Sequence, residues 1–252
     1  MLPNAAFATD ECKLFKSCFD KENKMVVIKS SGLRAALRII IPFVAIPALV
    51  LMGVYVFEDK MYAYISLVIT ILSIVLFISG FEQRKIGTRR MVLVVVLTVL
   101  SVIGRFFPII KPVTAITIIA GIYLGGEAGF LVGAISAVIS NFFWGQGPWT
   151  PFQMFAWGLI GLIAGLAAKP LRKNRLLLLI YGALSGALFS FIMDIWTVLW
   201  YNNGFDVSLY LTAISTAVPM TLVYAASNVI FLLFLAGPIG KKLERIKTVY
   251  GI

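Results

Sequence analysis

The sequence contains no histidine, few charged residues and only two cysteines among its 252 residues. Without histidine, the chain has no His-based metal site, no histidine general base and no Ser-His-Asp triad. Cys12 and Cys18 both precede the first hydrophobic segment, and they suit neither a disulfide framework nor a zinc site. Charged residues make up 13% of the chain, roughly half the share that is usual in soluble domains.

Hydrophobic residues, by contrast, make up 60% of the sequence, and the mean hydropathy is +0.97. A chain of this composition has too little polar surface to cover a water-soluble globule. The composition therefore predicts an integral membrane protein. It excludes a cytosolic enzyme, a secreted disulfide scaffold and a disordered regulator.

Eight apolar segments are expected to cross the membrane as helices, although several are shorter than the roughly 20 residues that a straight span needs. They lie at about 35–57, 61–81, 91–104, 113–124, 128–143, 152–168, 176–200 and 208–236. The basic stretch 82–90 separates the first two segments from the other six. The sequence therefore predicts an all-α membrane protein in which a two-helix hairpin at 35–81 precedes a six-helix core at 88–247.

The first 34 residues are polar and mixed in charge, and they lack the apolar run with a cleavage site that a secretory signal has. We expect 1–34 to form a cytoplasmic N-terminal segment. Met25 is an alternative start that would leave 1–24 untranslated, and the sequence leaves both starts open.

The net charge of +11 indicates how the chain is oriented in the membrane. With eight spans, 19 of the 22 Lys and Arg residues fall on the side of both termini, if Arg38 is counted with the N-terminal segment. Only Lys60, Arg105 and Lys111 fall on the opposite side. Because short cytoplasmic loops collect basic residues, both termini are expected in the cytoplasm. The charge therefore needs no nucleic-acid partner to explain it.

Pairs of small residues four positions apart recur in the core and are absent from the hairpin. The pairs are Gly121 with Gly125, Gly133 with Ala137, Gly161 with Gly165, and Gly182 with Gly186. Such pairs let helices approach closely in lipid. They serve either packing inside the bundle or contact with another membrane protein.

Several polar and aromatic residues gather on the external half of the predicted core. The candidates for ligand contact are Arg105, Lys111, Asn141, Gln146, Trp149, Gln153, Asp194 and Trp196. Asp194 is the only carboxylate well inside a core span, and an acid there is costly unless it has a function or a partner. Structural roles stay open for all of them: a buried hydrogen bond for Asp194, a helix cap or a loop anchor for Asn141, snorkelling for Arg105 and Lys111. The uncharged loop around Trp149 suits either stacking on a flat ligand or a buried plug.

Motifs for chemistry are missing from the sequence. It contains neither a GxxxxGK[ST] phosphate loop nor a GxSxG serine motif, so we expect no ATP hydrolysis and no enzymatic activity by this chain. A single intramembrane acid gives thin support to a lipid-modifying enzyme. A membrane-embedded enzyme that modifies lipids and an assembly subunit that binds no ligand are the alternatives from other functional classes.

The stretch SNFFWGQGPWTPFQMFAWGLIGLIAG, at 140–165, resembles the substrate-binding S-components of energy-coupling factor (ECF) vitamin transporters. The resemblance covers about 88–247 and leaves out the first two spans. It implies a subunit of a bacterial plasma membrane importer that captures a vitamin on its extracellular face. It further implies release of the vitamin through a coupling transmembrane subunit and two cytoplasmic ATPases, which use the ATP, so no cofactor is expected in this chain.

The resemblance also implies where ligand and partner bind. The ligand is expected under the loop after the first core helix, which adds Asn202 to the candidates above. The AxxxA face that family members offer to the coupling subunit is missing at 94–101, so Gly121, Gly125, Gly133, Ala137, Gly161 and Gly165 are expected to replace it. The GQGPWTP motif resembles the cobalamin-associated subgroup, which makes cobalamin or another corrinoid the expected ligand. Another vitamin or a queuosine precursor is the alternative.

Overall fold

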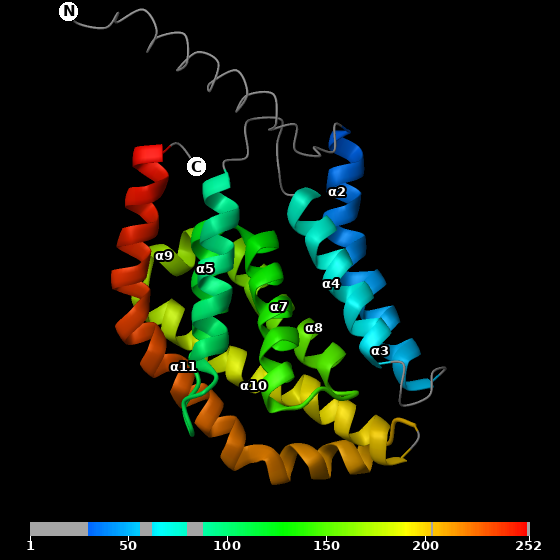
Figure 1. Ribbon diagram of the computed structural model, residues 1–252. Coiled ribbons are helices and arrows are strands. Elements are labelled where there is room, and N and C mark those ends of the chain that lie inside the picture. Colours follow the sequence, from blue (N-terminus) through cyan, green and yellow to red (C-terminus); the bar gives the residue numbers. More distant parts are fainter. Residues whose placement is uncertain (1–29, 56–61, 80–87, 203, 251–252) are drawn as a thin grey trace, which may run out of the picture.

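The structure, a computed structural model, describes residues 30–55, 62–79, 88–202 and 204–250, and helices make up nearly all of these ranges (Figure 1). In chain order they are α2 (Ser31–Ile40), η1 (Ile41–Ala45), α3 (Ile46–Tyr55), α4 (Tyr62–Ser79), α5 (Thr88–Gly104), α6 (Val113–Leu124), α7 (Gly126–Trp144), α8 (Thr150–Leu166), α9 (Ala168–Lys173), α10 (Arg175–Asn202) and α11 (Val207–Tyr250). No strand occurs in these ranges, which confirms the all-α prediction. Most of 1–34, the turn at Lys60 and most of the linker 82–90 lie outside the described residues.

The N-terminal hairpin begins four residues earlier than expected. Ser30 caps α2, because its side chain accepts a hydrogen bond of 3.3 Å from the Leu33 amide. Pro42 lies in the π-helical stretch η1, which changes the helical hydrogen bonding where proline cannot donate a hydrogen bond. The hairpin packs through α4 on α7 and α8, beside the core (Figure 1).

The centre of the core is α6, whose residues are almost all buried between α7, α8 and α11. Glycines let these helices approach closely: a Cβ atom at Gly129 would lie 2.6 Å from the Gly161 carbonyl oxygen and 2.7 Å from the Gly121 Cα. A Cβ atom at Gly133 would lie 2.5 Å from the backbone of Trp157. Packing of this kind needs a small residue at the point of contact, because a Cβ atom there would overlap the backbone of the neighbouring helix.

Most of the small residues expected to dock the coupling subunit therefore lie inside the core. Gly121, Gly133 and Gly161 take part in the contacts just described, and Ala137 is fully buried. Gly165 packs against the backbone of Gly126. Gly125, at φ +101°, makes the turn from α6 to α7. The structure assigns these residues to packing within the bundle, and their role in docking stays a prediction.

The last two helices wrap around one side of the core. The short helix α9 begins at the last residue of the predicted span 152–168 and ends before the predicted span 176–200, and α11 continues beyond the predicted span 208–236 to Tyr250. Figure 1 shows α11 running across the lower end of the molecule and then turning upward along the bundle; it contains Pro219 and Pro238. Proline bends helices, so the curvature of α11 has a local cause.

Each of the eight predicted spans coincides with an apolar helix. Four are long and apolar enough to cross a bilayer: Ser31–Met52, Gly126–Trp144, Arg175–Asn202 and Val207–Ile246. The apolar helices at Ala63–Ser79, Arg90–Gly104, Val113–Leu124 and Thr150–Leu166 are shorter. A multi-pass helical membrane protein is thus supported, whereas eight crossings, the hairpin-plus-bundle arrangement and cytoplasmic termini stay predictions.

Candidate functional site

A buried polar network lies where the C-terminal ends of α5 and α7 approach the N-terminal end of α8. Arg105 follows α5, and its Nη1 donates to Ser140 Oγ at 2.5 Å and to Asn141 Oδ1 at 2.6 Å. The Nδ2 of Asn141 donates to Thr150 Oγ1 at 2.8 Å and to Gln153 Oε1 at 2.9 Å. Asn141 is completely buried, and both its amide hydrogens are used within the protein. The network therefore joins three helices through neutral groups and one cation.

The loop between α7 and α8 is tied to the same network. The Nε2 of Gln146 donates to the Val138 carbonyl at 2.8 Å, and its Oε1 accepts from Thr150 Oγ1 at 3.0 Å. Gly145, at φ +100°, lets the chain turn sharply after α7. The amides of Gln146 and Asn141 thus hold the loop in place, which is the anchoring role left open by the sequence.

The two basic residues between α5 and α6 contact aromatic rings. Arg105 lies over Trp157 at 5.3 Å, and Lys111 Nζ lies 5.0 Å from the centre of the Trp144 ring. Burial lowers the pKa of Arg105 to about 10, so its guanidinium remains protonated at neutral pH. Burial, and to a smaller extent the charge of Arg105, lowers the pKa of Lys111. Both side chains are therefore held against aromatic rings, and Arg105 belongs to the polar network as well.

Three tryptophans form a row along one face of α10. The ring of Trp149 makes an edge contact with Trp196 at 5.8 Å, and Trp196 stacks on Trp200 at 6.2 Å. The Nε1 of Trp196 is buried and has no hydrogen-bond partner among the described residues. This row connects the loop before α8 to the end of α10.

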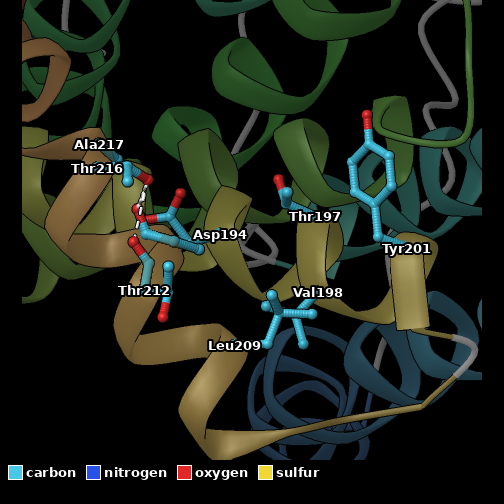
Figure 2. A pocket seen from close by; sticks show the side chains of 9 residues that line it. Asp194, Thr197, Val198, Tyr201, Leu209, Thr212, Thr216 and Ala217 are labelled. Carbon is cyan, nitrogen blue, oxygen red and sulfur yellow. Dashed lines mark hydrogen bonds between the residues drawn. The ribbon is translucent and has the colours of Figure 1, made fainter.

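A pocket of about 330 Å³ lies between α10 and the first half of α11 (Figure 2). Asp194, Thr197 and Val198 line it from α10. Thr212 and Thr216 line it from α11. The volume is at the lower end of the range for pockets that bind small molecules. The pocket therefore combines one carboxylate and several hydroxyl groups with an apolar remainder.

Asp194 and Trp196 do not belong to one binding surface. Residues two positions apart in an α-helix are rotated by about 200° around the helix axis, so their side chains point to nearly opposite sides. Trp196 faces Trp149, whereas Asp194 faces α11 across the pocket (Figure 2). The predicted site is therefore divided between two faces of α10.

The structure brings some of the predicted ligand residues together and leaves others apart. Arg105, Asn141, Gln146 and Gln153 share the polar network, and Trp149 meets Trp196. Of the predicted ligand residues, only Asp194 lines the pocket. The ammonium group of Lys111 lies over the ring of Trp144. Asn202, at the end of α10, donates a hydrogen bond of 3.4 Å to the Gly204 carbonyl.

The sequence analysis missed the threonines of the pocket. Thr212 and Thr216 are four residues apart and so lie on one face of α11. Asp194, Thr197 and Val198 have the same helical spacing on α10. A hydroxyl-bearing stripe facing an intramembrane acid was the signal that could have indicated this pocket.

The helical fold, its apolar surface and the pocket beside an intramembrane acid define a membrane-embedded binding protein. The family model described as "ECF-type riboflavin transporter, S component" matches residues 86–245. The chain therefore belongs to the ECF-type riboflavin transporter S component family. No curated protein and no solved structure matches the chain.

The family match confirms the resemblance to ECF S-components. An S-component is the substrate-binding subunit of a transporter, so the expectation that this chain is not an enzyme is also confirmed. The match begins after the hairpin α2–α4, which agrees with the prediction that the resemblance covers the core only. The match does not bear on the cobalamin-associated subgroup.

Proposed function

We propose that this chain captures riboflavin, or a close flavin analogue, from outside the cell and delivers it to an ECF importer. The observation that carries the proposal is the family match over 86–245, whose description names riboflavin. The pocket between α10 and α11 supports it, because its volume of about 330 Å³ suits a flavin better than the much larger corrinoids. Its mixed lining suits a ligand with a flat ring and a hydroxylated chain.

Cobalamin is the second candidate, and the GQGPWTP motif at 145–151 is what favours it. The tryptophan row beside that motif offers large aromatic surface to a large ligand. A corrinoid would have to occupy more than the pocket between α10 and α11. The two candidates therefore differ in the residues that they contact.

The partners follow from membership in the family. We infer that the chain works with a coupling transmembrane subunit and two ATPases, and that both its termini lie in the cytoplasm. The ligand end is then the lower end in Figure 1, which holds the loops at 105–112 and 145–149 and the start of α11. The ATPases use the ATP, and this chain supplies the specificity.

The ligand can be tested with the full chain purified in detergent. Riboflavin is titrated while its fluorescence is followed, and a corrinoid is titrated in parallel by calorimetry. Tight binding of riboflavin alone supports the first candidate. Tight binding of the corrinoid alone supports the second, and binding of neither overturns both.

A matched pair of variants tests whether the pocket is the site. Ala213 lines the pocket on α11, whereas Ala226 is exposed on the same helix and lies away from it. Ala213→Phe should fill the pocket and weaken riboflavin binding by at least roughly tenfold, a loss of about 1.4 kcal/mol. Ala226→Phe should bind as the natural chain does. Equal affinities for the two variants would place the ligand elsewhere.

A further inference from the structure

We propose that Asp194, Thr197, Thr212 and Thr216 form a wall that accepts hydrogen bonds but donates none, and that this wall selects free vitamin over its phosphorylated form. The inference rests on the proposed function, since it concerns the pocket between α10 and α11. It assigns these four residues a role in specificity. The wall is visible in Figure 2, where Asp194 of α10 faces Thr212 and Thr216 of α11.

The threonine hydroxyls have no hydrogen left for a ligand. Each hydroxyl carries one hydrogen and two lone pairs. Thr197 donates its hydrogen to the Met193 carbonyl at 3.1 Å, and Thr212 donates to the Ser208 carbonyl at 2.9 Å. Thr216 donates to the carbonyls of Thr212 and Ala213, at 3.0 and 2.9 Å. All three hydroxyls therefore offer only lone pairs to whatever occupies the pocket.

Asp194 adds a carboxylate to the same wall. The residue is 9% exposed, and its Oδ2 is buried with no hydrogen-bond partner among the described residues. The nine residues that line the pocket include no Lys or Arg, and the phenol of Tyr201, outside this wall, is the one further polar side chain among them and can both donate and accept. A buried carboxylate oxygen without a partner costs free energy until a donor reaches it. The pocket thus contains a buried acceptor atom, Asp194 Oδ2, that receives no hydrogen bond from the described residues.

The chemistry of a matching ligand follows from this inventory. A hydroxylated chain can donate to the carboxylate and to the threonine lone pairs. A phosphate ester replaces one donating hydroxyl with a group that carries about −1.5 to −2 charges at neutral pH and mainly accepts hydrogen bonds. Placed near Asp194, that group meets like charge and acceptor atoms, and both disfavour binding. The wall should therefore admit riboflavin and reject its 5′-phosphate.

The test compares the dissociation constants of riboflavin and riboflavin 5′-phosphate for the full chain. The natural chain should bind riboflavin at least about tenfold more tightly. Asp194→Asn removes the charge and adds a donor, so the ratio should fall several-fold. The matched control is Glu244→Gln near the far end of α11, where Glu244 pairs with Arg172. This control should leave the ratio unchanged.

Thr212→Val provides a second test, because Thr212 is exposed and its loss should be tolerated in folding. It removes one acceptor from the wall, so riboflavin binding should weaken about threefold to tenfold. Equal binding of the two flavins by the natural chain, or an unchanged ratio in Asp194→Asn, overturns the inference and leaves the proposed function standing. Binding of neither flavin overturns the proposed function and this inference with it.

Discussion

The side chain of Asn141, predicted as a candidate for ligand contact, makes its hydrogen bonds within the protein. Its type and position, at the end of an apolar helix, indicate a buried amide whose hydrogen bonds matter. In the structure these bonds go to Arg105, Thr150 and Gln153, all within the protein. We therefore regard Asn141 as a residue that positions the α7–α8 loop.

Replacing Asn141 with leucine should destabilise the protein markedly. The change removes one acceptor from Arg105 and the donors to Thr150 Oγ1 and Gln153 Oε1, losses that together cost about 2–3 kcal/mol. The midpoint of thermal unfolding in detergent should fall by roughly 5–10 °C. The control is Asn202→Leu, since Asn202 is exposed and makes one long hydrogen bond of 3.4 Å. Equal midpoints for the two variants would contradict the anchoring role.

Asp194 shows the limit of prediction from residue type alone. The sequence marks it as an unusual acid inside a membrane span, and the structure confirms that it is buried. Which neighbours it meets depends on the rotation of α10 and on the path of α11. That information is not local in the sequence, so Trp196 was grouped with Asp194 although they face different helices.

At the scale of helices, hydrophobic segments predicted the elements well, and their contacts less well. All eight apolar segments are helical where the structure describes them. The small-residue pairs predicted close helix approach, which the contacts of Gly121, Gly129 and Gly161 confirm. The sequence left open whether such a face meets a helix of the same chain or a partner. The continuation of α11 to Tyr250 was also missed, because charged residues there suggested a tail.

The junction of α6, α7 and α8 should be sensitive to a single methyl group. A Cβ atom on Gly161 would contact the Gly129 backbone and lie 2.8 Å from Thr117 Cγ2, so Gly161→Ala must push the helices apart. We expect a loss of about 1–3 kcal/mol in stability. Gly237→Ala is the matched control, because nothing lies within 4 Å of a Cβ there. It should be neutral or slightly stabilising, since alanine favours helix by up to about 1 kcal/mol.

Thermal unfolding of the two glycine variants in the same detergent provides the measurement. A lower midpoint for Gly161→Ala alone is the expected result. If both variants unfold like the natural chain, the three helices are not packed as closely as the structure indicates. If Gly237→Ala is the more damaging change, the outer face of α11 is packed against something in solution.

At the scale of the whole molecule, the helices α2–α4 lie outside the part of the chain that the family model matches, and they pack against that part. The family match begins at residue 86, and α2–α4 precede it. The hairpin nevertheless packs on α7 and α8, and Arg38 Nε pairs with Glu127 Oε1 at 2.9 Å. Glu127 lies in the first turn of α7, where a negative charge is favoured by the helix dipole. This ion pair therefore connects α2 to α7 at a partly exposed position, with 45% of the Arg38 side chain and 17% of the Glu127 side chain exposed.

Removing that charge should loosen the hairpin without opening the pocket. The side chain of Glu127 is 17% exposed, so its pairing with Arg38 is worth about 1 kcal/mol, at the upper end for ion pairs near a surface. In Glu127→Gln, hydrogen exchange of the α4 amides should accelerate about fivefold, because the hairpin separates from the core more often. The hydrogen-exchange rates of the α10 and α11 amides should equal those of the natural chain. Glu244→Gln is the control, since Glu244 pairs with Arg172 on the other side of the core and should leave α4 unchanged. Equal acceleration in all helices would mean that hairpin and core open as one unit, and no acceleration would mean that apolar packing alone holds the hairpin.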